Sequence, residues 1–484
     1  MHLFSAAARR AVPFCLLVLG GVFLAAVPSR AQSLGALQVE ATAFGTAGSA
    51  DRLPFWLSAN TYGTIDGSAG NLGTRLSVAR PFRGDGGFDY AFGTDLLARV
   101  SDQSTLHAHQ LYGQVRYRKL QLTAGRREQM IGRVDTALSL GSTTWSRNAT
   151  PPPKVSLSSD GYLSVPGTND IVAVKGYFAY GWLEADRFVE EAFLHEKYLY
   201  LRLLPSDFPV TAHAGLTHHV QWGGTHPRRG DQAAGFEEWI NVVLGQRSIG
   251  EDAPGESAGQ ANHIATYDFS LSADLGGGRA LAYREFYHED TPSLLFRNPW
   301  DGIWGLSLRR DDASALVNAV LWEHLRMTRH NAKFSEGEER GNDRYYHHST
   351  YAGGWVYEGR TLGNPMLTPN RTAPGVANTI VIAQHVALEG ALSPHLSYRL
   401  FGTYSRNYGA QGICANADCS RRVDGRTPRR DQWSFLAAVI GSLSARHGLS
   451  YEAAVALDTG EFYEDRVGVR VGLTWNGVYT PVTP

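Results

Sequence analysis

The chain has 484 residues, of which 43% are hydrophobic and 19% are charged, and this apolar content excludes a globally disordered protein. Its formal net charge of −1 argues against a nucleic-acid-binding protein that works through bulk positive charge. The length fits either about three ordinary domains or one large β-barrel.

The N-terminal segment predicts export. Two arginines precede an apolar stretch over 11–27, and Ser29 and Ala31 then give a small-x-small cleavage pattern. This combination is typical of a secretory signal peptide, and the apolar stretch is too short for a membrane anchor. We therefore expect a signal peptide over 1–31, cleaved near Ala31, and one mature domain over 32–484.

Hydropathy leaves two classes open for the mature chain. No later stretch reaches the ~18 consecutive apolar residues that indicate a transmembrane helix. The chain is then either a soluble secreted protein or an outer-membrane β-barrel. Strands of such a barrel escape a hydropathy search because only every second residue is apolar.

Alternation of apolar and polar residues distinguishes these classes. Over 210–222 one face consists of Val, Ala, Leu and Trp, the other is polar or Gly, and His218 is the one break. This period of two residues is that of a β-strand with one apolar face. Comparable segments lie at 36–46, 72–80, 88–96, 105–117, 171–182, 197–203, 267–275, 279–287, 303–310, 315–326, 351–360, 379–388, 396–405, 432–443, 449–457 and 467–475.

The length of these segments favours the membrane. A tilted strand of about 9–11 residues crosses a bilayer. Tryptophans lie at several segment ends, as expected for interfacial girdles: Trp182, Trp222, Trp304 and Trp475. A soluble β-sandwich would also alternate, but the number and length of the segments predict an all-β fold, a transmembrane antiparallel β-barrel.

The C-terminal third suggests an orientation. Bacterial barrels have short periplasmic turns, long outer loops and both termini in the periplasm. The connection 406–431 is long and polar, whereas 390–394 and 444–448 are short, so we expect 406–431 to be an outer loop. Upstream this alternation fails, because 327–350 is long where a short turn is required. A strand is therefore missed or misplaced in that region.

Two segments have helical periodicity instead. In 186–197 and in 236–246, apolar residues recur at three- and four-residue spacing. We expect two helical insertions there, acting as plugs or periplasmic caps of the barrel.

Candidate binding chemistry is concentrated in the predicted outer loop. Cys414 and Cys419 are expected to form a local disulfide in an oxidising compartment. Guanidinium groups bind carboxylates and phosphates, so an acidic polysaccharide or the phosphate of lipopolysaccharide is a candidate partner. The alternative is a solvated charged loop without a ligand. The arginines concerned are Arg421, Arg422, Arg426, Arg429 and Arg430.

No catalytic, cofactor or metal motif is recognisable. The pairs His218–His219 and His347–His348 would point to opposite faces of a strand, so neither is a chelate. We find no G-x-S-x-G, P-loop or dinucleotide fingerprint. We therefore expect no enzyme, no cofactor and no metal, although an active site of Ser or His with a carboxylate at one rim stays an alternative.

Several longer segments together resemble one known family. In chain order they read LPFWLSANTYG at 53–63, AGRREQMIG and LSLGSTTWSRNATPPPKVSL within 124–167, FLHEKYLYLRL at 193–203, GLTHHVQWGGTHP at 215–227, YREFYHEDTPSLLFRNPWDGIWGLSL at 283–308 and YEGRTLGNP at 357–365. The sequence is similar in these segments to the Wzi-type capsule assembly proteins of the outer membrane. They span most of the mature chain.

This resemblance implies a barrel of about 18 strands with periplasmic helices and a largely occluded pore. It implies a non-enzymatic surface lectin that helps to attach or assemble capsular or extracellular polysaccharide. The implied setting is the bacterial outer membrane, with contacts to lipid and lipopolysaccharide, no nucleic acid, and a monomer. A porin or transporter for a polar solute is the alternative.

One motif of the resemblance supplies further candidate glycan contacts. Trp145 and Asn148 lie in the segment WSRNA, which precedes three prolines. Either these two side chains contact sugar, or the segment is a structural turn.

Overall fold

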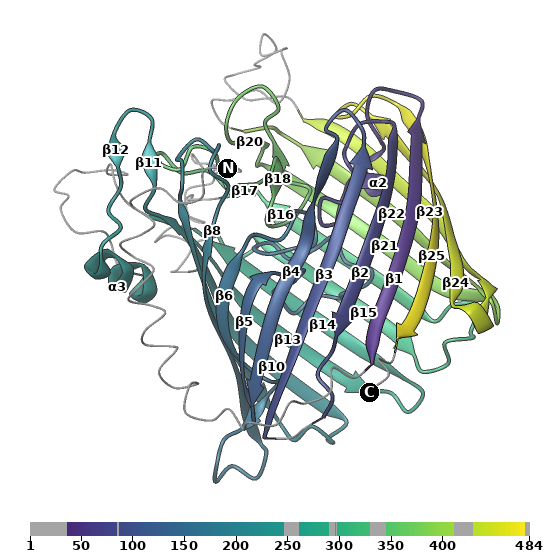
Figure 1. Ribbon diagram of the computed structural model, residues 1–484, viewed down its shortest axis with the longest axis horizontal. Coiled ribbons are helices and arrows are strands. Elements are labelled where there is room, and N and C mark those ends of the chain that lie inside the picture. Colours follow the sequence, from purple (N-terminus) through teal and green to yellow (C-terminus); the bar gives the residue numbers. More distant parts are fainter. Residues whose placement is uncertain are drawn as a thin grey trace, which may run out of the picture.

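The computed structural model describes residues 36–84, 87–245, 261–289, 296, 298–329, 345–410 and 429–479. The predicted signal peptide lies outside the described residues. The same holds for Cys414, Cys419, Arg421, Arg422 and Arg426. Within the described residues the chain forms a closed antiparallel barrel (Figure 1).

Eighteen strands form the wall in the part of the chain that is described, if β6 and β7, which both pair with β8, count as one interrupted strand. Successive strands pair, and β1 pairs with β25 to close the barrel. The strands are β1 (Leu37–Gly48), β2 (Asn71–Arg80), β3 (Phe88–Val100), β4 (Thr105–Tyr117), β5 (Leu120–Arg126), β6 (Lys154–Ser159), β7 (Leu163–Ser164), β8 (Val172–Trp182), β9 (Phe193–Leu203), β10 (Val210–Trp222), β13 (Asn262–Asp274), β14 (Gly278–His288), β15 (Gly302–Arg310), β16 (Ala319–Met327), β21 (Val381–Ser393), β22 (Leu396–Asn407), β23 (Arg430–Ser444), β24 (Leu449–Gly460) and β25 (Arg466–Tyr479).

The wall is apolar outside and polar inside, as the alternation predicted. On β25 the side chains of Val467, Val469 and Val471 are 45–58% exposed on the outer surface. Arg466, on the opposite face of β25, is buried in the lumen with Asp458. Closure pairs every wall strand with two neighbours, which satisfies backbone groups that lipid cannot.

The shortest and the longest connections lie at opposite rims. Connections of a few residues, such as 118–119, 275–277 and 394–395, join strands at one end, which we call the short-turn rim. The longest connections join strands at the other end, the long-loop rim; they are 127–153 and the described parts of 223–261 and 328–380. The two terminal wall strands, β1 and β25, begin and end at the short-turn rim. The barrel topology predicted for the C-terminal third is confirmed.

The upstream failure of the alternation between short and long connections has a simple origin. The segment 351–360 alternates but contains no wall strand. Inside the barrel, β17 (Val356–Tyr357) of this segment pairs with β18 (Arg360–Thr361) to form a small hairpin. The prediction also missed β5 and β6, which are too short to show a clear period. With these corrections 328–380 becomes one long connection at the long-loop rim.

The helix predicted over 186–197 is wrong. Strand β9 begins at Phe193 and pairs with both β8 and β10 along its length. Leu199, Leu201 and Leu203 face outward from it, because the two-residue period of the wall overrides the local helical spacing.

The helix predicted over 236–246 is present as α3 (Phe236–Leu244). Two glutamates in its first turn complement the helix dipole, and Gly245 ends it with a left-handed φ of 69°. α3 belongs to the connection between β10 and β13 at the long-loop rim and lies beside the wall (Figure 1), so it is neither a plug nor a periplasmic cap as expected. Its Val242 packs with Trp222, which is 2% exposed and so contributes nothing to the predicted girdle. Trp304 and Trp475 are 37% and 44% exposed.

The remaining elements are short. They are α2 (Phe55–Ser58), the 3₁₀ turn Ala445–His447, and the two-stranded pairs β11 (Thr225–His226) with β12 (Gly230–Asp231) and β19 (Thr368–Pro369) with β20 (Val376–Asn378). Among the described residues, no helix is both long and apolar enough to cross a membrane.

Candidate functional site

Three connections from the long-loop rim fold into the lumen. They are 49–70, which contains α2, 127–153, and the described part of 328–380; we call them together the plug. Figure 1 shows β17, β18 and β20 gathered with α2 near one end of the barrel. Apolar side chains of all three belong to one buried cluster with the wall. The plug is therefore a packed part of the fold.

Buried carboxylates of the wall hold the plug by its backbone. Glu323 on β16 accepts hydrogen bonds from the Leu140 N–H at 2.7 Å and from the Ser139 hydroxyl at 2.5 Å. Glu285 on β14 accepts them from the Thr143 N–H at 2.8 Å and from its hydroxyl at 2.9 Å. Both carboxylates are fully buried, where an unpaired charge would be costly. They therefore fix the position of the 127–153 connection.

The plug connections are also bonded to each other. The Trp355 indole N–H donates to the Thr144 carbonyl at 2.7 Å, and the Ser146 hydroxyl donates to the Gly363 carbonyl at 2.6 Å. A Cβ at Gly363 would lie 2.4 Å from the Thr143 carbonyl oxygen, so only glycine permits this close approach.

The 49–70 connection reaches the C-terminal strands of the wall. The Phe55 N–H donates to the Asp458 carboxylate at 2.9 Å, and the Trp56 ring packs against Phe401 with centroids 4.6 Å apart. Arg360 of β18 donates to the Ser58 carbonyl at 2.8 Å. Burial lowers the pKa of Arg360 to about 10, so it remains a cation at neutral pH.

Other wall strands complete the ring of contacts. Arg99 on β3 donates to the Gly63 carbonyl at 2.9 Å, and Gln221 on β10 donates to the Gly354 carbonyl at 3.1 Å. His385 on β21 lies 2.9 Å from the Leu138 carbonyl. The plug is thus bonded to the wall on nearly every side of the lumen.

Trp145 and Asn148, the candidate glycan contacts, lie inside the plug and are 4% and 5% exposed. The Trp145 ring stacks on His219 of β10 at 5.8 Å, and the Lys154 ammonium lies 4.3 Å from its centroid. The Asn148 amide donates to the Thr361 carbonyl at 3.0 Å. A glycan could reach either side chain only after the plug moved, so their direct sugar contact stays a prediction.

Sequence reasoning missed the ion pair beneath Trp145. Lys154 lies 2.6 Å from Glu196 of β9, and His219 lies 3.3 Å from the same carboxylate. One signal could have indicated this ion pair: Lys154 directly follows three prolines and is one of the few lysines in the chain. Glu196 escaped notice because its segment was assigned to a helix.

Of the five candidate arginines, Arg429 and Arg430 are described and lie at the long-loop rim. Arg430 is the first residue of β23. Arg429 donates from Nε to the Asp431 carboxylate at 2.5 Å and from Nη2 to the Tyr404 hydroxyl at 3.0 Å. Its side chain is 45% exposed, so an anion can reach it in competition with Asp431.

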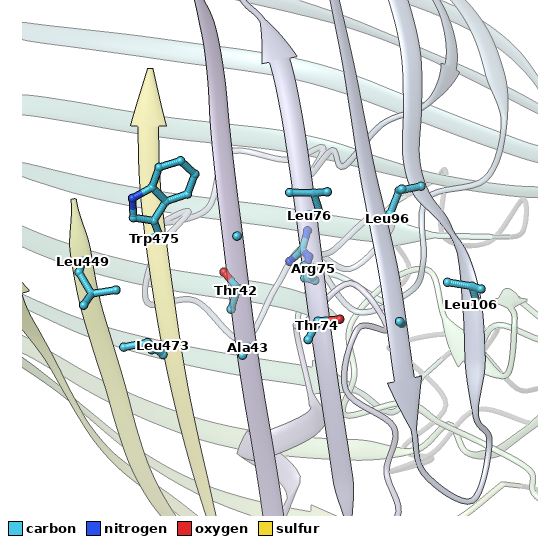
Figure 2. A pocket seen from close by; sticks show the side chains of 12 residues that line it. Thr42, Ala43, Thr74, Arg75, Leu76, Leu96, Leu106, Leu449, Leu473 and Trp475 are labelled. Atoms are coloured by element: carbon cyan, nitrogen blue, oxygen red, sulfur yellow. The ribbon is translucent and has the colours of Figure 1, made fainter. Parts of the chain in front are cut away.

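A hollow of about 390 Å³ lies on the outer face of the wall around β1 (Figure 2). Figure 2 shows Leu76 on one side of it, Trp475 and Leu473 on the other, and small residues such as Ala43 between them. Arg75 also borders it, but its guanidinium pairs with Asp95 and Glu128. This apolar surface suits lipid rather than a sugar.

No group of three or more potential metal-ligating side chains is found among the described residues. The site thus consists of two parts. Polar and charged groups lie at the long-loop rim, and the plug, which is bonded to the wall, lies beneath them.

Comparison with known proteins gives one family. The family model of the capsule assembly protein Wzi matches residues 54–372. A comparison with curated proteins gives no match.

One solved structure supports the fold, and a second is similar over most of its length. The Escherichia coli protein Wzi, described as an outer membrane protein involved in group 1 capsule assembly and a carbohydrate binding beta-barrel, is 14% identical with a TM-score of 0.58. That match covers 90% of this chain and 83% of the other. OccK5 (OpdH) of Pseudomonas aeruginosa is 10% identical with a TM-score of 0.46, covering 92% and 98% of the two chains.

Proposed function

We propose a function for this chain from the family to which it belongs, the Wzi capsule assembly proteins. The chain is an outer-membrane β-barrel. It binds capsular or extracellular polysaccharide at the cell surface, helps to attach or assemble it there, and catalyses no reaction. It works as a monomer in contact with membrane lipid and lipopolysaccharide.

The observation that carries this proposal is the plug beneath the long-loop rim. Long connections of bacterial barrels face the outside of the cell. In the lumen under these loops, hydrogen bonds join side chains of the wall strands to the backbone of the plug. A barrel closed in this way serves surface binding better than diffusion of a solute through its lumen.

The outer loops are the proposed contact surface. Arg429, Arg430 and the three arginines before them supply cations, and Tyr404 and its neighbour Trp433 supply aromatic surface near the same rim. Individual contacts to a polymer are weak, but repeated units engage many barrels and the contacts sum. If the polymer is acidic, binding weakens as salt screens the charges.

The test is binding of the detergent-purified protein to the surface polysaccharide of its own source cells over a salt series. Saturable, glycan-selective binding is expected, with a salt slope that falls when all five arginines are replaced by Gln. Unchanged binding in the five-fold variant would remove the arginine role. No binding to the polysaccharide, together with steady single-channel conductance of the same sample, would favour the porin alternative.

A further inference from the structure

A polar groove of about 210 Å³ lies in the lumen beneath the plug. It follows β5, β6, β8 and β9, and strand register places its side chains on the lumenal face. Gln121 and Ser158 line its end near the short-turn rim, and Gln129 and Lys154 line its end under the plug. We call it the lumenal groove. It faces the rim that is periplasmic in bacterial barrels.

The charged side chains that line the lumenal groove are all cations: Arg127, Lys154 and Lys175. Lys154 is paired with Glu196. Within the described part of the chain, Arg127 and Lys175 have no carboxylate at ion-pair distance. Two cations facing a lumen without acidic partners favour an anionic occupant, because a charge-assisted hydrogen bond is stronger than a neutral one.

Aromatic and polar groups flank these cations. The rings of Tyr177 and Tyr198 stack with centroids 5.0 Å apart and an angle of 9°. The Lys175 ammonium lies 5.7 Å from the Tyr198 centroid, so a cation lies beside an aromatic pair. The remaining lining side chains are mainly hydroxyls and amides, which donate and accept hydrogen bonds. A sugar ring that carries a carboxylate has matching apolar C–H, hydroxyl and anionic groups.

We infer that the lumenal groove is a binding subsite for an acidic saccharide unit that enters from the periplasmic side. This inference rests on the proposed function, and adds a second, internal contact with a defined substrate class. Lys175 near the short-turn end and Arg127 near the plug end supply the positive charge that attracts the carboxylate, the tyrosine pair contacts the ring, and Gln121 and Ser158 bind hydroxyls. The plug ends the groove, so the subsite holds a short segment or chain end and does not conduct a polymer.

The first test uses a glucuronic acid tetrasaccharide and, for comparison, neutral maltotetraose, with calorimetry on the full-length protein in detergent. The double variant Arg127→Gln/Lys175→Gln should weaken binding of the acidic probe by about tenfold or more, while the neutral probe changes little. Lys119→Gln is the matched control, because Lys119 is exposed in the β4–β5 turn at the same rim. Equal loss in both variants, or no loss in the double variant, would overturn the inference.

The second test locates the probe. In a background with Cys414→Ser and Cys419→Ser, Ser158→Cys should react with a maleimide from the short-turn side, and the acidic tetrasaccharide should slow this labelling. Gln103→Cys, exposed between β3 and β4 at the other rim, should label at an unchanged rate.

These readouts distinguish the two proposals. Polysaccharide bound by the protein without protection of Ser158→Cys would exclude the lumenal subsite and leave surface binding intact. Protection of Ser158→Cys without binding of the native polysaccharide would support the lumenal subsite and exclude polysaccharide binding at the cell surface.

Discussion

The carboxylate of Glu323 accepts a 2.7 Å hydrogen bond from the backbone N–H of Leu140, 183 residues away. Glu323 belongs to a wall strand and Leu140 to the connection that enters the lumen between β5 and β6. The buried carboxylate positions the loop through a backbone N–H and through the neighbouring Ser139 hydroxyl. Glu285 repeats this device at Thr143.

Removing both carboxylates should open the lumen. Glu285→Ala/Glu323→Ala leaves the Leu140 and Thr143 donors buried without acceptors, at about 1–3 kcal/mol each. We expect measurable ion conductance in planar bilayers where the wild-type protein shows little. Glu389→Ala is the control, because Glu389 pairs with Arg309 and Arg399 and not with the plug. Unaltered conductance in the double variant would mean that the plug is held by its apolar contacts.

A single methyl group should loosen the plug in a different way. A Cβ on Gly363 would lie 2.0 Å from the Tyr346 hydroxyl and 2.4 Å from the Thr143 carbonyl oxygen. Gly363→Ala should therefore lower the thermal stability of the plug and raise conductance. Gly70→Ala, with no heavy atom within 4 Å of the added carbon, should change neither quantity. The idea fails if the two variants behave alike.

Trp145→Ala tests whether the WSRNA segment is structural. Truncating a buried Trp costs about 3–5 kcal/mol. It also uncovers Lys154, which lies over the indole ring. We expect a lower unfolding temperature and higher conductance. Any loss of polysaccharide affinity should accompany the loss of stability, because it would arise only through outer loops that rest on the plug. A large loss of affinity at unchanged stability would instead indicate direct sugar contact by Trp145.

Asn148→Ala is a separate test of the same segment. Its amide bonds to the Thr361 carbonyl and hydroxyl, so its loss leaves an unpaired buried acceptor. Differential scanning calorimetry should record destabilisation of about 1–3 kcal/mol. Normal stability with weaker glycan binding would contradict a purely structural role.

Asp431→Asn should strengthen binding of an acidic polysaccharide. Asp431 occupies two nitrogens of the Arg429 guanidinium, so a ligand carboxylate must compete with it. Removing this charge frees Arg429 and should raise affinity severalfold at low salt, with a steeper salt dependence. Asp312→Asn, in an exposed turn at the short-turn rim, has the same charge change as a control. Weaker binding by Asp431→Asn would show that Asp431 serves mainly to order Arg429.

The sequence by itself determined most of the wall, although β5 and β6 are too short to show a clear period. β4 and β10 have the bounds that alternation predicted, because each side chain of a barrel strand faces either lipid or lumen and this choice repeats every two residues. The family resemblance added the expectation of a largely occluded pore. Only the tertiary structure decided that 351–360 lies inside the barrel, that the strand over 197–203 begins already at Phe193, and that Trp145 is buried. These outcomes depend on partners such as Glu323 and Leu140, which closure of the barrel brings together and no local period encodes.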